Sequence, residues 1–192
     1  MRGKFIVLTG LDGSGTSSVA TELHRLDRGS NLLNSIITPY TLSRRQIDEV
    51  VQNVSPAAHY LFYLSAVVYA SCLVDEALEK GNVYCVRHLI DTVVSHRVAG
   101  LDVGLEYKTS LFRIPKPDFI IFLDVNEELR QERIDKRGKG YLDKKLDDDG
   151  FRVHFIIEFL KLSDHFVRID VGNKSIAEIA QEVRSILKID NS

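Results

Sequence analysis

The chain has 192 residues, of which 44% are hydrophobic and 27% are charged. This length and composition are typical of one globular domain, so disordered and fibrous classes are excluded. The 25 lysine and arginine residues are balanced by 27 aspartate and glutamate residues, which leaves a formal net charge of −2. A duplex-binding protein usually carries a basic domain or stripe, so we expect no nucleic-acid partner and only a local anion site.

The N-terminal segment leads directly into a short β-like run and lacks the apolar stretch of about 7–15 residues that a secretory signal needs. The longest apolar runs, such as Phe119–Leu123 and Ala66–Tyr69, are much shorter than the roughly 20 residues that cross a bilayer. We therefore expect a cytoplasmic protein with no membrane partner. In such a protein the two cysteines, Cys72 and Cys85, are expected to be buried and inert.

The first predicted elements are a buried strand over Phe5–Thr9, a glycine-rich turn and the start of a helix. Glycine tolerates positive φ, so the N–H groups of such a turn can point toward one spot, which also faces the positive end of the helix. The phosphate-loop template G-x-x-x-x-G-K-[ST] is met at Gly10, Gly15 and Ser17, while Thr16 replaces the lysine. The predicted phosphate-binding residues are Gly10, Asp12, Gly13, Ser14, Gly15, Thr16, Ser17 and Ser18.

Two residues of this loop have opposite consequences for chemistry. The hydroxyl of Ser17 would bind Mg²⁺, as the template's serine or threonine does, unless it is an ordinary first-turn serine. Thr16 cannot place a positive charge between the β- and γ-phosphates, and losing a charge-assisted contact there costs roughly a few kcal/mol. Since about 1.36 kcal/mol of transition-state stabilisation is tenfold in rate, phosphate binding is expected to survive better than catalysis.

Two other nucleotide-binding classes fit the sequence less well. A GTPase needs Asn-Lys-x-Asp after a strand, and the run Asn173–Ile176 fails at its last position. A dinucleotide-binding loop needs Gly-x-Gly-x-x-Gly, and Ser18 occupies the third glycine position after Gly13 and Gly15. We therefore favour the phosphate loop over both.

Further along the chain, continuous apolar runs predict four more buried parallel strands. Stretches with helical spacing separate them, so strands and helices alternate and predict one α/β domain over residues 1–192. The additional strands are Ser35–Thr38, which is the weakest, Val83–Val86, Phe119–Asp124 and Phe166–Asp170.

Three later helices have recognisable ends. A long helix begins after the N-cap Ser55, followed by proline, and ends before Gly81. The charged stretch 139–150 is interpreted as either a solvated loop or a mobile lid. The other two helices run from Asn126 to Gly138 and from Ser175 to about Leu187.

The strand and loop over residues 5–15 resemble those of the thymidylate kinase family almost residue for residue, and the resemblance continues in order over nearly the whole chain. It implies a P-loop NTPase fold, with a five-stranded parallel sheet, helices on both faces and a short lid over about residues 138–150. Ligands of such a sheet bind above the carboxyl ends of its strands. The resemblance also implies ATP, Mg²⁺ and small nucleotide substrates, and a homodimer for which the run Leu61–Leu73 is a candidate surface, unless that run is core.

The resemblance assigns acceptor roles to three residues, and the segment after the third strand adds a fourth candidate. Asp12 matches a carboxylate that contacts the sugar of the acceptor nucleotide, and it could also orient an attacking oxygen, although shaping the loop is a serious alternative. Phe62 falls where the family stacks an aromatic ring on the acceptor base, unless it is a core phenylalanine. Arg87 is retained from the family's Asp-Arg pair, and Asp91 follows it as a further substrate-binding residue.

On the donor side, the resemblance places cations near the phosphates when the lid closes. Arg133, Arg137 and Lys144 would then supply the charge that the loop lacks, with Arg133 and Arg137 acting as catalytic residues beside Asp12. On sequence alone, an arginine at a helix end is more often solvated. Lys4 is another candidate for the missing charge.

Three positions depart from the family pattern. Thr16 removes the loop cation, and Val86 replaces the acid of the Asp-Arg pair. Ala66 stands where the family has an arginine that reaches the acceptor, and a register shifted by two would offer Leu64 and Val68 instead. The family's Glu-Pro-Gly-Gly loop after the second strand is not found either.

The sequence thus predicts ATP- and Mg²⁺-dependent phosphoryl transfer to a nucleoside monophosphate, which is dTMP by resemblance. One alternative is a nucleotide-binding protein with weak or no kinase activity, because three family contacts are missing together. Another is a kinase for a different small acceptor, in which His88, Asp91 and His96 could line an altered pocket.

Overall fold

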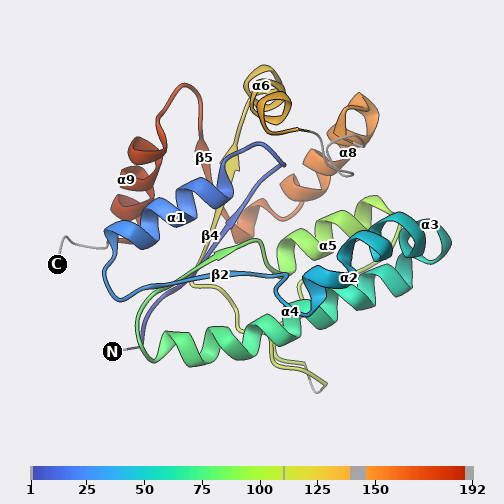
Figure 1. Ribbon diagram of the computed structural model, residues 1–192, viewed down its shortest axis with the longest axis horizontal. Coiled ribbons are helices and arrows are strands. Elements are labelled where there is room, and N and C mark those ends of the chain that lie inside the picture. The colour runs from blue at the N-terminus through green and yellow to red at the C-terminus, as the bar shows by residue number, and fades with distance from the viewer. Residues whose placement is uncertain (1, 110, 139–145, 189–192) are drawn as a thin grey trace.

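The computed structural model of the protein describes residues 2–109, 111–138 and 146–188. Within these ranges the strands are β1 (Phe5–Thr9), β2 (Asn31–Asn34), β3 (Val83–Val86), β4 (Phe119–Asp124) and β5 (Val167–Asp170). They form one parallel sheet in the order β2-β3-β1-β4-β5, with β1 at its centre (Figure 1). The expected α/β fold with a five-stranded parallel sheet is confirmed.

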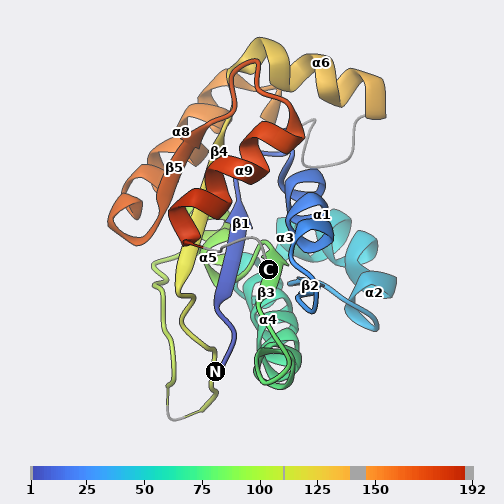
Figure 2. The ribbon, with the colours of Figure 1, turned by 90° about the vertical axis from the view of Figure 1, so that its left-hand side faces the viewer.

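Helices cover both faces of the sheet, as Figures 1 and 2 show. One face carries α1 (Thr16–Leu26) and α9 (Ile176–Leu187), and the other carries α4 (Pro56–Leu78), α5 (Leu89–Val98) and α8 (Asp149–Leu160). Successive side chains of a strand point to opposite faces. Ile6 and Leu8 therefore join the core under α1 and α9, whereas Phe5 and Val7 join the core under α4, α5 and α8.

The structure has further helical elements besides those that cover the two faces of the sheet. They are α2 (Tyr40–Gln46), the π-helical turn η1 (Ile47–Val51), α3 (Gln52–Val54), α6 (Glu127–Arg137) and the 3₁₀ turn η2 (Ser163–His165). Figure 1 shows α6 above the loop that follows β1, and α2 and α3 beside α4 and α5. The helical structure between β2 and α4 is a feature that the sequence analysis did not predict.

Side-chain caps begin the three predicted helices where they were expected. The Ser55 hydroxyl accepts a hydrogen bond from the backbone of Ala58 at 3.2 Å, so α4 begins at Pro56. Asn126 caps α6 in the same way, and Ser175 caps α9 with a reciprocal bond from its own backbone to Glu178.

The predicted strand at Ser35–Thr38 is wrong. The strand lies just before it, where Asn31 to Asn34 pair in register with Val83 to Val86 of β3. Because β2 is at the edge of the sheet and is only partly buried, it does not need the continuous apolar run that the prediction relied on.

The run Leu61–Leu73, which is the candidate dimer surface, lies on α4, and its side chains are partly in the core and partly exposed. Val67 and Ala70 are buried, whereas Leu61 and Tyr69 are exposed by 62% and 42%. Cys72 is also exposed, so the expectation of two buried cysteines holds only for Cys85. Among the described helices, α4 is also long and apolar enough to cross a membrane, with a mean hydropathy of 1.5. Core helices of soluble proteins meet this criterion as well.

Two buried histidines make the fold sensitive to acid. Burial lowers the pKa of His88 to about 3 and that of His96 to about 4, against roughly 6.5 in an unfolded chain. Below pH 6.5 the unfolded chain binds more protons than the folded chain. Stability is therefore expected to fall from about pH 6.5 toward pH 4, by up to about 1.4 kcal/mol per pH unit for each histidine.

Urea unfolding at pH 7 and pH 5 measures this loss. In His88→Gln the loss of unfolding free energy between the two pH values should be smaller than in the wild type. The matched control is His154→Gln, since His154 lies half-exposed on α8 and should leave the loss unchanged. Equal losses in His88→Gln and the wild type would contradict the prediction.

Candidate functional site

The glycine-rich turn after β1 has the backbone conformation that its sequence predicts. Gly10, Gly13 and Gly15 have φ values of 151°, 92° and 95°, and Gly15 is the N-cap of α1. A Cβ atom at Gly10 would lie 2.6 Å from the carbonyl oxygen of Leu123, so this position requires glycine for space as well as for conformation. The turn therefore directs backbone N–H groups and the N-terminus of α1 toward one place.

A cavity opens above this turn, and we call it the loop cavity. Its walls come from the turn, from α6 and from the first residues of α9. The residues that line it are Asp12, Gly13, Ser14, Gly15, Thr16, Ser17, Ser18, Val19, Arg87, Arg133, Arg137, Ile176 and Ile179. Most of the predicted phosphate-binding residues are thus brought together with both predicted arginines. Gly10 shapes the turn from below, and Lys144 lies outside the described residues.

Arg133 is the cation that lies over the turn. Its Nη1 is 3.4 Å from the carbonyl oxygen of Gly13 and 3.3 Å from that of Ser14. Lys4, by contrast, donates to the carbonyl of Leu187 at the last turn of α9 and lies over the ring of Phe119, so it does not supply the missing loop charge. Of the cations considered for this role, Arg133 and Arg137 of α6 line the loop cavity.

A buried arginine of α6 that the sequence analysis did not single out also contacts the turn. The side chain of Arg130 is fully buried, and its Nε donates to Glu127 at 2.6 Å. Its Nη1 lies 3.4 Å from the carbonyl oxygen of Asp12, and its Nη2 lies 3.4 Å from that of Leu146. This guanidinium therefore ties the loop to the segment that precedes α8.

The loop cavity suits a divalent cation that is held mainly by a ligand. In the described part of the chain, no group of three or more His, Cys, Asp or Glu side chains could hold a metal by itself. Mg²⁺ commonly keeps several waters and binds through substrate phosphates with one or two protein oxygens. The exposed Ser17 hydroxyl lines the cavity and fits that role. The buried Ser14 hydroxyl has no partner within the described residues, which suits an oxygen-rich ligand above the turn.

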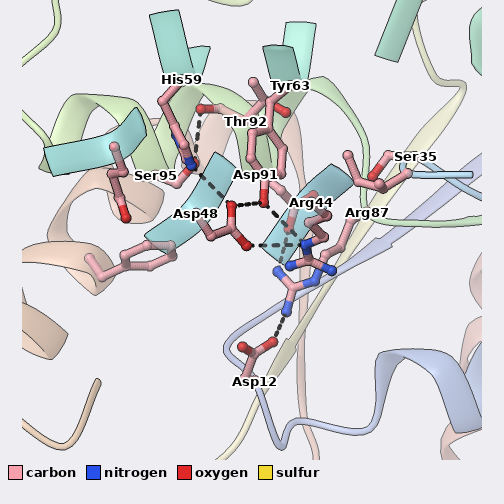
Figure 3. A pocket seen from close by; sticks show the side chains of 13 residues that line it. Asp12, Ser35, Arg44, Asp48, His59, Tyr63, Arg87, Asp91, Thr92 and Ser95 are labelled. Atoms are coloured by element: carbon pink, nitrogen blue, oxygen red, sulfur yellow. Dashed lines mark hydrogen bonds and ion pairs between the residues drawn. The ribbon is translucent and has the colours of Figure 1, made fainter. Parts of the chain in front are cut away.

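A second cavity lies on the α4 side of the sheet, and we call it the helix cavity (Figure 3). Its walls come mainly from α2, η1, α3, α4 and α5, with one aromatic ring from α8. The residues that line it are Asp12, Ser35, Ile36, Arg44, Asp48, Gln52, His59, Tyr63, Arg87, Asp91, Thr92, Ser95 and Phe155. Charged side chains enter it from the turn after β1, α2, η1, the end of β3 and α5.

The two cavities share Asp12 and Arg87, which form an ion pair at their junction (Figure 3). Arg87 also donates to Asp91 at 2.9 Å, and the Thr9 hydroxyl donates to the same carboxylate at 2.6 Å. Burial would lower the pKa of Arg87, but the two carboxylates outweigh it and hold the pKa above its ordinary value. The guanidinium is thus a fixed positive charge between the cavities.

Val86 carries no acidic group, and the carboxylate beside Arg87 comes from Asp91. Val86 is nearly buried at the end of β3, and the next residue, Arg87, has a positive φ of 61°. The carboxylate that holds Arg87 comes instead from the first turn of α5, where Asp91 also accepts from the backbone of His88 at 3.0 Å. An acid therefore pairs with Arg87, but it comes from α5 and not from the position of Val86.

The face that α4 turns toward the helix cavity differs from the predicted one. Tyr63 lines the cavity together with His59, one turn earlier, whereas Phe62 is not among its described lining residues. The ring of Phe62 packs against Tyr40 on α2, with 5.5 Å between ring centroids. Ala66 is fully buried in the core, and the nearby cation in the cavity is Arg44 of α2.

The three residues that were considered for an altered pocket separate into different environments. Asp91 lines the helix cavity, as predicted. His88 is buried in the core against the ring of Phe5, with 5.1 Å between ring centroids. His96 is also buried, and it lies behind the cavity wall in contact with His59.

Several residues of the helix cavity were not predicted. His59 and Tyr63 are four residues apart, which places them on one helical face, and this spacing was an available signal. Asp48 lies on the π-helical turn η1, a type of turn that is frequent at functional sites but has no reliable sequence pattern. Arg44, Gln52 and Phe155 also line this cavity.

The expected lid over about residues 138–150 falls largely on residues 139–145, which lie outside the described residues. At its far end the chain is already ordered into α8 from Asp149. Leu146, which precedes α8, is buried, and its carbonyl oxygen accepts from Arg130. The last residues of the expected loop therefore belong to a helix.

Comparison with known proteins adds to this geometry. A family model described as thymidylate kinase matches residues 8–183. The chain is 25% identical over 193 residues to a probable thymidylate kinase of Methanocaldococcus jannaschii, covering 96% of this chain and 95% of that protein. It is 28% identical over 195 residues to a probable thymidylate kinase of Methanosarcina barkeri, covering 95% of each.

Solved structures show the same fold. A thymidylate kinase from Candida albicans matches with a TM-score of 0.72 at 20% identity, over 97% of this chain and 92% of that chain. A deoxyadenosine kinase from M. mycoides matches with a TM-score of 0.66 at 15% identity, over 96% and 98% of the two chains. The fold is therefore that of the P-loop NTPases, as the loop predicted.

Proposed function

Because the chain belongs to the thymidylate kinase family and is thus a nucleotide kinase, we propose that it uses ATP and Mg²⁺ to phosphorylate a nucleoside monophosphate. One observation carries the proposal: the loop cavity and the helix cavity meet at Asp12 and Arg87. Transfer between two bound phosphates needs two sites that adjoin at a charged junction. ATP and nucleoside monophosphates are cytoplasmic metabolites, so we also propose a cytoplasmic location.

The donor triphosphate occupies the loop cavity in this proposal. The backbone N–H groups of the turn bind its phosphates, and Arg133 and Arg137 of α6 approach the transferred group from above. Ser17 would hold Mg²⁺, which bridges phosphate oxygens and offsets their charge when it is bound. The cations of α6 then stabilise the charge that spreads over the transferred phosphoryl group.

The acceptor occupies the helix cavity, with its phosphate toward the junction. Arg44 and Arg87 both line this cavity, and either guanidinium can donate two hydrogen bonds to a phosphate. Asp12 holds Arg87 in place and orients the acceptor beside the loop. Positioning of this kind supplies most of the catalysis in phosphoryl transfer.

The acceptor is dTMP by resemblance, and one observation favours a different small acceptor. Ala66 is fully buried in the core. The end of the helix cavity that lies away from Asp12 and Arg87, where the base of the acceptor would bind, is lined instead by Asp48, His59 and Tyr63. A cavity with a carboxylate and an imidazole in its wall offers hydrogen-bond partners that suit bases other than thymine.

An acceptor screen tests the proposed function. Purified protein is incubated with ATP, Mg²⁺ and each of dTMP, dUMP, dCMP, dAMP and dGMP, and the nucleoside diphosphate is detected by chromatography. We expect ATP turnover to increase with at least one monophosphate. Phosphorylation of a monophosphate other than dTMP would support the different acceptor. ATP binding without any product across the panel would instead support a nucleotide-binding protein with weak or no kinase activity.

A further inference from the structure

Three side chains from three elements form a hydrogen-bonded chain in and behind the wall of the helix cavity. His59 of α4 lies between Asp48 of η1 and His96 of α5. Its Nδ1 is 2.7 Å from Nε2 of His96, and its Nε2 is 3.1 Å from Oδ1 of Asp48. Asp48 and His59 both line the cavity (Figure 3), while His96 lies behind them. The chain ends on the carbonyl oxygen of Thr92, which is 2.6 Å from Nδ1 of His96.

The protons of this chain can be counted from its fixed end. A carbonyl oxygen only accepts, so Nδ1 of His96 carries a proton and donates it to Thr92. Burial lowers the pKa of His96 to about 4, so near neutral pH its Nε2 has a lone pair. His59 must therefore donate from Nδ1. If His59 were neutral, its Nε2 would then carry a lone pair and no proton. That lone pair would face the carboxylate of Asp48, which has no proton either, so the contact would contain no hydrogen bond.

The contact between His59 and Asp48 thus requires one extra proton, and the neighbours of Asp48 decide where it lies. The Tyr63 hydroxyl donates to Asp48 at 2.6 Å, and Arg44 lies 3.4 Å from its other oxygen. Burial would raise the pKa of Asp48, but the hydrogen bonds from His59 and Tyr63 and the charge of Arg44 hold it below its ordinary value. The Tyr63 hydroxyl and the Arg44 guanidinium favour the ionised form of Asp48 whatever the state of His59, so Asp48 is a carboxylate and the extra proton lies on His59.

The surroundings of His59 offer it a single carboxylate partner. Five titratable or charged groups face the hydrogen-bonded histidines from the elements packed against them. They are Asp48 of η1, Arg44 of α2, Tyr60 and Tyr63 of α4, and His96 of α5. Burial raises the pKa of both tyrosines, so neither competes as an anion. The side chain of His59 is only 6% exposed, so water does not replace these partners.

The extra proton sets the charge of the helix cavity. With it, three cations balance three anions, and without it the cavity carries a net charge of about −1. A phosphate monoester carries about −1.5 to −2 at neutral pH, so it would enter a repulsive site. Asp48 would also be left to pair with Arg44, which draws that guanidinium away from a phosphate. The charged lining residues are Arg44, His59, Arg87, Asp12, Asp48 and Asp91.

We propose that His59 is a positioning residue that is held as an imidazolium between Asp48 and His96, and that its proton is needed for tight binding of an anionic acceptor. The inference rests on the proposed function only in identifying the acceptor as a nucleoside monophosphate. Its core is a protonation state that can be observed without any turnover.

The protonation state is read by ¹H–¹⁵N long-range correlation of the imidazole nitrogens. The chain has six histidines, and His59→Gln identifies the signals of His59 by their disappearance. At pH 7 we expect both nitrogens of His59 to be protonated and His96 to be neutral with its proton on Nδ1. A neutral His59 at pH 7 would overturn the inference, whether or not the protein is an active kinase.

A second experiment measures KM for the acceptor as the pH is raised from 7, where the acceptor phosphate is already doubly charged. Over the interval in which the spectra show His59 losing its proton, KM for the acceptor found in the screen should rise about tenfold, while KM for ATP stays constant. A rise of this size corresponds to the loss of about one unit charge from the wall of the cavity that holds the acceptor. An acceptor KM that does not follow the His59 titration would overturn the role in binding.

Two variants separate positioning from a merely structural effect. In Asp48→Asn the amide can donate to Nε2, so His59 should become neutral at pH 7 and the acceptor KM should lose its pH dependence. The control His154→Gln removes a histidine on α8 that lies 3.6 Å from Glu158, and it should keep the wild-type profile. Failure of every monophosphate in the screen would refute the proposed function and leave the spectroscopic result standing.

Discussion

Replacing Asp12 with asparagine is expected to lower kcat for acceptor phosphorylation by about 100-fold. Asparagine keeps the shape of the side chain, but it removes the charge that holds Arg87 at the junction of the two cavities. The reacting groups are then less well positioned, and small displacements of this kind can cost about 100-fold in rate. Steady-state kinetics with saturating ATP and the acceptor found in the screen measure the loss.

The effect of Asp12→Asn on folding should be small. Arg87 keeps Asp91 as its partner, so the change leaves no unpaired charge at the junction. We expect a loss of about 1 kcal/mol, which lowers the melting temperature of a chain of this size by about 2–4 °C. The matched control is Asp75→Asn, which breaks an exposed ion pair with Arg2 and should leave kcat unchanged. A wild-type kcat in Asp12→Asn would reduce Asp12 to a residue that only shapes the loop.

The strands at the centre of the sheet could be predicted from sequence because burial on both faces leaves a direct trace. β1, β3 and β4 coincide with continuous apolar runs, as parallel strands under helices require. β2 could not be located in this way. It is an edge strand that begins and ends with asparagine, and the apolar pair Ile36 and Ile37 follows it in the next connection.

The loop cavity was predictable to a similar degree, since one contiguous segment supplies most of its wall. The positive φ values and the helix entry are local properties of that segment. The helix cavity has no such segment. Its charged and titratable groups come from the loop, α2, η1, α4, the end of β3 and α5, and only the packing of these elements brings Asp48 against His59.

The misplacement of Phe62 has a physical cause of its own. Neighbouring residues on a helix point about 100° apart, so a shift of one position turns a different face toward a cavity. Apolar side chains surround most of α4, and its hydrophobicity therefore marks no single buried face. Under those conditions the sequence cannot decide whether Phe62 or Tyr63 faces the helix cavity, and in the structure Tyr63 lines it.

The largest loss is expected from Arg133→Ala, which should lower kcat by about 100- to 1,000-fold. In a typical phosphate loop the lysine contributes to the charge around the transferred group, but Thr16 leaves this loop without it. Arg133 is a loop-cavity guanidinium whose Nη1 contacts the backbone of the loop, and removing one preorganised donor at such a position costs about 100- to 1,000-fold. Lys136→Ala on the same helix removes an exposed cation that pairs with Glu132, and it should leave kcat within about twofold.

A double-mutant cycle then shows whether Arg133 takes the place of the loop lysine. Thr16 lines the loop cavity, so a lysine at this position can extend toward the same phosphates that Arg133 approaches. If the two cations act on the same charge, Thr16→Lys should raise kcat by at least about tenfold in the Arg133→Ala background and by much less in the wild type, because neighbouring groups with a shared partner are not additive. Equal gains in both backgrounds would mean that the lysine and Arg133 act independently. No gain in either would mean that the loop geometry, and not the missing cation, limits the rate.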